Sequence, residues 1–221
     1  MNRYKKVLRN LAREKKALLE NYDNQSKINM WTDVNDLKAK RPPVIIYQVP
    51  WSEFPLMDEI SIDKEDKYLW DIEYKLRRDI HELRHFPADM VYFNTIECPP
   101  VVYDSGFMLD NKVDIIRSGH INAQHFTPVI TEMDDIEKIK EATVDYDREA
   151  TAKRLDALND IFGGICEVEL TGKRGYWFTP WDYLISRTGV TEAMIDLIER
   201  PDFVNAYVSR FVDVMVKYMQ R

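Results

Sequence analysis

The spacing of apolar side chains along the chain predicts a series of amphipathic helices. Apolar residues recur at helical intervals over residues 2–22, 64–85, 147–162, 191–199 and 202–219. In the first segment, lysines and arginines occupy the positions between the apolar residues, as expected of a helix that buries one face. Five helices are therefore expected, and the pair Gly163-Gly164 is a stop signal for the third of them.

Short apolar runs between these helices predict strands. The run Val-Ile-Ile-Tyr-Gln-Val at 44–49 is rich in β-branched residues and is typical of a strand buried on both faces. Two further strands are expected at 90–93 and 166–170. Strands that alternate with helices favour βαβ units and a parallel sheet, in which functional side chains follow the carboxyl ends of the strands.

Two stretches fit neither pattern. Residues 101–130 contain turn signals without a clear period and are expected to be irregular. Residues 131–149 carry eight acidic against three basic side chains and are expected to form a solvated surface segment. No internal repeat and no linker rich in Gly, Ser or Pro interrupts the chain, so one domain is predicted.

Candidate catalytic and binding side chains follow from these positions. Glu97 comes after the second predicted strand, where a carboxylate can act as a general base or bind a polar substrate. His120 and His125 lie in the irregular stretch, and loop histidines near strand ends serve as acids, bases or substrate ligands. Gln48 and Trp51 follow the first predicted strand and are candidates for substrate contacts.

A dense aromatic stretch follows the third predicted strand. Residues 176–183 contain five aromatic side chains in eight positions. Such a cluster forms either a wall of the hydrophobic core or the lining of a large flat pocket suited to a tetrapyrrole or a pterin.

The sequence also contains a literal H-E-x-x-H motif at residues 81–85. On a helix this spacing places two histidines one turn apart, able to hold zinc, with the glutamate as general base. The nearest candidate for a third ligand is Glu97. However, Pro87 ends the predicted helix at the second histidine, so two histidines on a half-exposed helix end are the favoured interpretation and a zinc peptidase is a third alternative.

Composition and charge narrow the function classes. The 221 residues include 31 basic and 38 acidic side chains, for a net charge of −7, which argues against a nucleic-acid binder. Two cysteines, Cys98 and Cys166, cannot build a disulfide framework or a four-cysteine zinc site. No apolar run has the length of a membrane span and no signal-peptide core is recognisable, so a reducing, cytoplasmic location without a membrane is expected.

Several segments, in order, resemble one known family. The chain is similar to the uroporphyrinogen decarboxylase superfamily, and most of all to its corrinoid (methylcobalamin) methyltransferase-like branch from anaerobes. The resemblance covers roughly residues 40–215. It rests on residues 42–48, 84–91, 98–107, 125–126, 133–140, 177–183 and 200–204.

The resemblance implies a (β/α)8 TIM barrel with its site at the carboxyl ends of the strands. A complete barrel of this type needs about 250 residues, whereas only three strands are recognisable here. We therefore expect an α/β fold consisting of an N-terminal helical extension at 1–40 and a partial, N-terminal half barrel at 41–221. A corrinoid protein, a complementary barrel half or a second copy of the chain would then be the partner.

The resemblance further implies methyl transfer, a reaction of one-carbon metabolism, between a methylcorrinoid and a thiol or pterin acceptor. Glu97, His125 and His120 would activate or orient the acceptor. The residues expected to contact the substrate are Gln48, Trp51, Tyr103, Trp177 and Asp182. The His-x-Cys pair of the zinc-using relatives has no counterpart here, so no metal is expected. The alternative from another class is a non-catalytic binding or assembly subunit.

Overall fold

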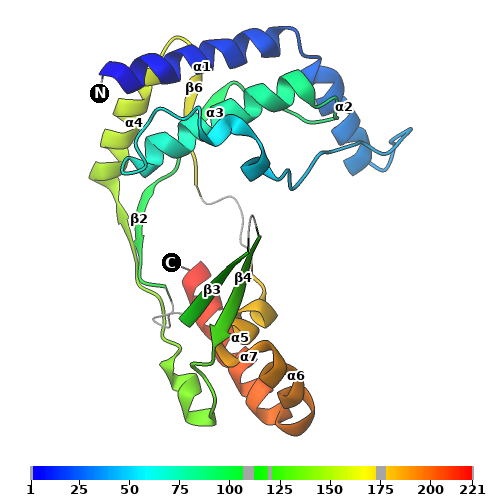
Figure 1. The fold of residues 1–221 in the computed structure, drawn as a ribbon, viewed down its shortest axis with the longest axis vertical. Coiled ribbons are helices and arrows are strands. Elements are labelled where there is room, and N and C mark those ends of the chain that lie inside the picture. The colour runs from blue at the N-terminus through cyan, green and yellow to red at the C-terminus, as the bar shows by residue number, and fades with distance from the viewer. Residues whose placement is uncertain (1, 107–111, 119–120, 173–177, 221) are drawn as a thin grey trace. The chain divides into compact units, whose positions relative to one another are not determined.

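A computed structural model of the chain combines helices with short strands, which confirms a mixed α/β composition. The chain divides into two compact units, each built from two stretches of sequence (Figure 1). Unit 1 comprises Met1–Pro99 and Thr151–Thr171, and unit 2 comprises Pro100–Ala150 and Gly172–Arg221. The structure describes residues 2–106, 112–118, 121–172 and 178–220.

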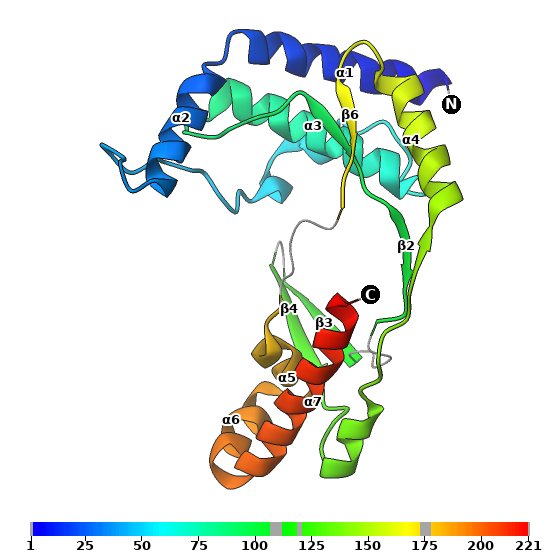
Figure 2. The ribbon, with the colours of Figure 1, turned by 180° about the vertical axis from the view of Figure 1, so that it is seen from behind.

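Unit 1 is mainly helical, with one pair of parallel strands. Its elements are α1 (Asn2–Glu20), α2 (Asn24–Asn35), two short 3-10 turns (Trp51–Glu53 and Pro55–Met57), α3 (Lys67–His85), β1 (Thr95–Cys98), most of α4 (Arg148–Phe162) and β6 (Glu167–Leu170). Strands β1 and β6 pair in parallel, with Glu97 opposite Glu169. Helices α1 and α3 lie side by side in both Figure 1 and Figure 2.

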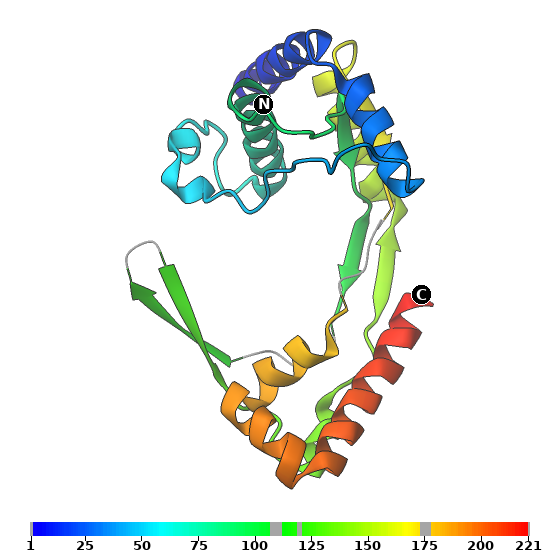
Figure 3. The same cartoon turned by 90° about the vertical axis from the view of Figure 1, so that its right-hand side faces the viewer.

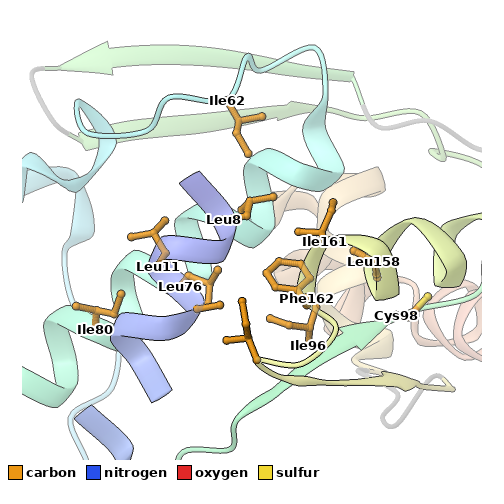
Figure 4. Close-up of a cluster of buried hydrophobic side chains, with 12 residues drawn as sticks. Leu8, Leu11, Ile62, Leu76, Ile80, Ile96, Cys98, Leu158, Ile161 and Phe162 are labelled. Carbon is orange, nitrogen blue, oxygen red and sulfur yellow. The ribbon is translucent and has the colours of Figure 1, made fainter. Parts of the chain in front are cut away.

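The core of unit 1 follows from the periodicity of these helices. Side chains from α1, α3, β1 and α4 point toward one another around Phe162, which is fully buried (Figure 4). Figure 4 labels ten of the twelve core side chains: Leu8, Leu11, Ile62, Leu76, Ile80, Ile96, Cys98, Leu158, Ile161 and Phe162. Because burial of apolar area is the main favourable contribution to folding, this cluster fixes the helices around β1.

Unit 2 contains three helices at its C-terminal end, preceded by antiparallel strand pairs (Figure 3). Its elements are β2 (Val101–Asp104), β3 (Lys112–Ser118), β4 (Ile121–Thr127), a 3-10 helix (Met133–Lys138), β5 (Val144–Asp147), α5 (Pro180–Thr188), α6 (Val190–Glu199) and α7 (Pro201–Met219). Strand β2 pairs with β5, and β3 with β4. Gly189 joins α5 to α6 with a φ of 92°, a backbone conformation that favours glycine.

The core of unit 2 is more aromatic. Tyr207 and Phe211 of α7 are buried, and the Phe211 ring lies 4.5 Å from the Tyr183 ring and 5.6 Å from the Phe178 ring. The Tyr207 hydroxyl donates a 3.0 Å hydrogen bond to the Tyr183 carbonyl, so this buried polar group is paired. These contacts hold α5 against α7.

All five helices expected from the periodicity are confirmed, within three residues at each end. Gly164 follows α4 with a φ of 79°, as the stop signal predicted. Helices α2 and α5 were not expected. The predicted strand at 166–170 is confirmed as β6. The division into 1–40 and 41–221 is not tested by these elements and stays a prediction.

The parallel sheet was predicted more widely than it occurs. Among the described residues the strands pair in twos, and the β1–β6 pair alone is parallel. No barrel is formed within this part of the chain, so the (β/α)8 expectation stays a proposal. The β1–β6 pair is the element that most resembles the predicted βαβ arrangement, because α4 precedes β6.

The prediction of a strand at 44–49 was wrong. These residues pair with no strand among the described residues, and most of their side chains are exposed. The Val44 backbone forms hydrogen bonds to Asp89 and not to a strand. Pro42, Pro43 and Pro50 lack the backbone N–H that a sheet needs, and Gln48 has a φ of 57°, which breaks an extended strand. High β propensity therefore did not outweigh the flanking backbone restrictions.

The prediction of a strand at 90–93 was also wrong, since the strand begins at Thr95 instead. Side chains of unit 1 form hydrogen bonds with the backbone N–H and C=O groups of residues 90–92, which a neighbouring strand would otherwise bond. The Asn24 side chain accepts from the Tyr92 N–H at 3.0 Å and donates to the Tyr92 carbonyl at 2.7 Å. The Tyr22 hydroxyl donates to the Met90 carbonyl at 2.8 Å.

The two stretches between these elements are more ordered than predicted. Residues 101–130 contain β2, β3 and β4 rather than irregular chain. The segment 131–149 was expected to be a solvated surface, yet Ile136 and Ile139 are buried in the core of unit 2. Ile136 and Ile139 are three positions apart, and the 3-10 helix that contains Ile136 packs against α7. The acidic residues around them made this apolar spacing hard to recognise in the sequence.

Candidate functional site

Glu97 lies beside a cavity of about 280 Å³ in unit 1. The cavity forms between β1, one face of α3 and Lys15 of α1. Helical spacing brings the α3 residues onto one face, since they recur every three or four positions. The lining residues are Lys15, Tyr68, Asp71, Ile72, Lys75, Leu76, Asp79, Thr95, Ile96, Glu97 and Pro99.

Alternation along β1 determines how Glu97 is presented. Ile96 and Cys98 are buried, whereas the intervening Glu97 is exposed, as the two-residue period of a strand requires. The Glu97 carboxylate makes no hydrogen bond or ion pair with any residue that the structure describes. It is thus available to a ligand at the carboxyl end of the strand.

Tyr68 and Cys98 flank this position and stay protonated at neutral pH. Burial raises the pKa of Tyr68 to about 12, and its hydroxyl donates a 3.3 Å hydrogen bond to the Glu97 carbonyl. The Arg154 guanidinium lies 4.6 Å from the centre of the Tyr68 ring. Burial also raises the pKa of the Cys98 thiol, which disfavours the thiolate needed for nucleophilic attack.

A buried ion pair forms one end of the cavity. The Lys15 ammonium lies 2.7 Å from the Asp79 carboxylate, and both residues are buried. Lys75, one helical turn before Asp79, approaches the same carboxylate at 3.6 Å. Burying two charges costs desolvation energy, which their attraction offsets only when they stay paired.

Sequence reasoning singled out Glu97, whose role stays a prediction, and did not single out Lys15 and Asp79, which also line the cavity. A signal was present, because each is a charged residue on the apolar face of its helix. Lys15 follows Leu8, Leu11 and Ala12 at helical spacing. Charges of opposite sign on the buried faces of two helices indicate a buried pair.

The H-E-x-x-H motif occupies the last turn of α3 and makes mainly packing contacts. His81 lies edge-on against Trp51 and Phe54, at ring distances of 5.8 and 5.1 Å. Burial, and then the charge of His85, lowers the pKa of His81. Glu82 accepts a 3.2 Å hydrogen bond from the Tyr92 hydroxyl, so it already has a protein partner.

Among the described residues, no three His, Cys, Asp or Glu side chains lie close enough together to hold a metal ion. In the same part of the chain, no helix is both long and apolar enough to cross a membrane.

Gln48 and Trp51, the other candidates in unit 1, do not line the Glu97 cavity. Gln48 is exposed in the left-handed backbone conformation. Trp51 is buried against His81 and Phe86, and the Arg78 guanidinium lies 4.7 Å from its ring centre. Trp51 therefore fastens the loop before α3 to the end of that helix.

Three further candidates lie in unit 2, and all are exposed. Tyr103 is on β2 opposite Asp145, His125 is on β4 opposite Asp114, and Asp182 is in the first turn of α5. The three residues therefore lie on three different elements. His120 and Trp177 lie outside the described residues.

Comparison of the chain with protein-family models, with curated proteins and with solved structures finds no match in any of the three. The resemblance to the uroporphyrinogen decarboxylase superfamily accordingly stays a prediction, carried by the sequence segments alone.

Proposed function

We propose that the chain is the substrate-binding part of a methyl-transfer enzyme similar to the corrinoid methyltransferases of the uroporphyrinogen decarboxylase superfamily. The observation that carries the proposal is the position of Glu97. It lies at the carboxyl end of β1, which pairs in parallel with β6, and it borders a cavity. Carboxyl ends of parallel strands are where α/β folds place their chemistry.

The size of the cavity assigns it to the smaller reactant. Pockets for drug-sized ligands measure roughly 300–1,000 Å³, so about 280 Å³ encloses a small molecule and does not enclose a corrin ring. We assign to this cavity the thiol or other small partner of the reaction, and we assign no residue to the methylcorrinoid. A methylcorrinoid, when bound, would supply an electrophilic methyl group.

Glu97 would orient the small reactant and accept its proton. A thiol acceptor must lose a proton before it attacks a methyl group, and a free carboxylate at hydrogen-bonding distance can receive it. Ile72 and Leu76, which also line the cavity, would exclude water from it.

Turnover by the full chain tests this proposal. The protein is mixed with methylcobalamin and a small thiol, and the methylated thiol is measured by mass spectrometry. We expect acceleration over the uncatalysed reaction and a loss of roughly a hundredfold to ten-thousandfold in Glu97→Gln, the range for a general base. Glu169→Gln, which changes the same residue type opposite Glu97 on β6 but outside the cavity, should keep the activity. Equal rates with and without protein would refute the proposal.

A non-catalytic assembly subunit is the second candidate, favoured by exposed apolar residues. Val44, Ile45 and Tyr47 are 57%, 51% and 80% exposed, and they follow one another in the extended segment after Pro43. Exposed apolar runs of this kind are typical of interaction surfaces. Light scattering distinguishes the candidates when combined with a methylcobalamin titration, because an assembly subunit would show a larger mass without corrinoid affinity.

A further inference from the structure

We propose that a second cavity of unit 1 binds a small carboxylate with an apolar body, and that the carboxylate pairs with Arg154. The inference does not rest on the methyl-transfer proposal, because Glu97 does not line this cavity and Tyr68 is the only lining residue that the two cavities share. It is carried by an arginine without an acidic partner at the wall of a space that is otherwise mainly apolar.

The second cavity measures about 320 Å³ and lies between the start of α1, the start of α3 and one face of α4. Leu69, Leu158 and Ile161 supply aliphatic surface to it, and the rings of Tyr4 and Tyr68 supply aromatic surface. Leu158 and Ile161 also belong to the core cluster drawn in Figure 4. Pockets for drug-sized ligands measure roughly 300–1,000 Å³, so this cavity suits a small molecule.

Both tyrosine hydroxyls of the lining already have partners in the protein. The Tyr4 hydroxyl donates to the Asp63 carboxylate, and the Tyr68 hydroxyl donates a 3.3 Å hydrogen bond to the Glu97 carbonyl. The two side chains therefore offer a ligand mainly the carbon surface of their rings.

The charged side chains of the lining reduce to one cation. Lys5 and Asp160 both line the cavity and neutralise each other, with the ammonium 2.7 Å from the carboxylate. No other ion pair within the described residues involves either of them. The charge that remains is that of Arg154, so the cavity favours an anion over a cation.

Contacts with two neighbours fix the Arg154 guanidinium at this wall. Its central carbon lies 4.6 Å from the centre of the Tyr68 ring, so the guanidinium covers a ring that lines the cavity. One of its nitrogens donates a 2.9 Å hydrogen bond to the Pro99 carbonyl. Arg154 is half-buried, and in the part of the chain that the structure describes no carboxylate pairs with it. Its remaining N–H groups can therefore bond a ligand without breaking an ion pair.

These features together select the chemical class of the ligand. The planar fork of a guanidinium matches a carboxylate, which accepts two parallel hydrogen bonds from it. The apolar surface of the cavity requires an apolar body on the same molecule, because a small hydrated anion would leave that surface uncovered. A neutral compound of the same shape would lose the charge-assisted hydrogen bonds.

Probes that share a phenyl ring and differ in charge test the inference on the full chain. Sodium benzoate, benzamide and benzamidinium chloride are titrated separately at constant ionic strength, without any corrinoid, and amide chemical shifts are followed. We expect saturable binding of benzoate, roughly tenfold tighter than that of benzamide, and the weakest binding for benzamidinium. Equal affinities, a preference for benzamidinium or no saturable binding of benzoate would each overturn the inference.

Sodium acetate tests whether the apolar body matters. Acetate keeps the carboxylate and lacks the ring, so it should bind roughly tenfold more weakly than benzoate. Acetate that binds as tightly as benzoate would show that the apolar surface takes no part, and it would overturn the assigned class of ligand.

Substitution of the arginine then locates the site. Arg154→Met removes the guanidinium and keeps an apolar stem, so it should weaken benzoate binding roughly tenfold and leave benzamide binding within about twofold. Lys153→Met is the matched control: Lys153 is the preceding residue of α4, is exposed and does not line the cavity, so this variant should bind as the wild type does. Circular dichroism verifies that both variants are folded. Unchanged benzoate affinity in folded Arg154→Met would refute the site.

A second variant fills the cavity and does not depend on the arginine. Ala157 lines the cavity at an exposed position of α4, so Ala157→Leu should fold even if Arg154→Met does not. Because it removes volume and not charge, it should weaken benzoate and benzamide binding by the same factor, roughly tenfold. Ala152→Leu, at an exposed position of α4 outside the lining, should change neither. Benzoate affinity that is unchanged in Ala157→Leu, or lowered equally in Ala152→Leu, would refute the site.

Discussion

The two compact units differ in how they use buried polar side chains. In unit 1, buried charges join elements to one another, whereas the core of unit 2 brings the Phe211 ring against the rings of Phe178 and Tyr183. Unit 2 also has a buried arginine, Arg187. Asp89 accepts hydrogen bonds from both Arg41 and Lys27, and Glu73 accepts from the Ile62 N–H at 3.0 Å and from Arg77 at 2.8 Å. In unit 2, Asp196, buried and paired with Arg200, is one counterpart.

This difference indicates which substitutions each unit should tolerate. Apolar packing tolerates substitutions that conserve volume, but a buried charge tolerates almost none without its partner. The buried charges of unit 1 lie close to the Glu97 cavity or hold the loops before α3. Substitutions at the buried charges of unit 1 are therefore expected to be tolerated less well than volume-conserving substitutions in the core of unit 2.

The largest effect is expected where the two cores are truncated. Phe162→Ala in unit 1 and Phe211→Ala in unit 2 should each lower the free energy of unfolding by about 4 kcal/mol, because each leaves a cavity in a closely packed cluster. Amide hydrogen exchange should show the loss of protection first in α1, α3 and α4 for Phe162→Ala, and in α5 and α7 for Phe211→Ala. Equal loosening of both units by either substitution would contradict the description of two separate cores.

A smaller loss of stability is expected when the buried ion pair between Lys15 and Asp79 is broken. Lys15→Met should lower the free energy of unfolding by about 3 kcal/mol, because Asp79 keeps only the longer contact with Lys75. The double variant Lys15→Met/Asp79→Leu should recover most of this loss, since it removes the uncompensated charge. Urea unfolding measures both.

The control for the ion pair is Lys5→Met. Lys5 pairs with Asp160 at 2.7 Å, but the side chains are 34% and 63% exposed, so the pair should contribute under about 1 kcal/mol. If Lys15→Met/Asp79→Leu were less stable than Lys15→Met, the loss in Lys15→Met would not come from the unpaired charge of Asp79, and the prediction would be wrong.

Sequence reasoning succeeded where structure is local and failed where partners come from afar. The helical period of α3 can be recognised from residues that are close together in the sequence. Glu97 was expected in a loop after a strand at 90–93, but it lies within β1. Lys15 and Asp79 are 64 positions apart, so nothing near either residue names its partner. Likewise, the Asn24 side chain hydrogen-bonds the backbone of Tyr92, 68 positions away. The strand therefore lies at 95–98 and not at the predicted 90–93.

The charge network at Asp89 should produce a pH-dependent difference in stability. Hydrogen bonds from Arg41, and then from Lys27 and the Val44 N–H, hold the pKa of Asp89 well below its usual range. A carboxyl group with a lowered folded-state pKa stabilises the protein above its unfolded pKa of about 3.9, and the stabilisation is lost as the pH falls toward the folded-state value. Asp89→Asn should therefore lower the thermal midpoint by roughly 5 °C at pH 7.

The difference between wild type and Asp89→Asn should shrink steadily below about pH 4, because the wild-type carboxyl group then begins to lose its advantage. Asp36→Asn is the matched control: Asp36 pairs with Lys38, and both side chains are at least half exposed. It should leave the midpoint unchanged at all pH values. A constant gap for Asp89→Asn down to pH 2 would contradict the assigned network.

The smallest effect is expected on the exposed face of α6 in unit 2. Ile198 is 84% exposed and Met194 is 55% exposed, so neither side chain contributes much buried area. Ile198→Lys should change the free energy of unfolding, measured by urea unfolding, by less than about 0.5 kcal/mol. The matched change at a buried isoleucine of the same unit, Ile139→Lys, should prevent folding of unit 2, because it places a charge in the core. If Ile198→Lys lowered the free energy of unfolding by more than about 1 kcal/mol, the Ile198 side chain would be covered in solution and this prediction would be wrong.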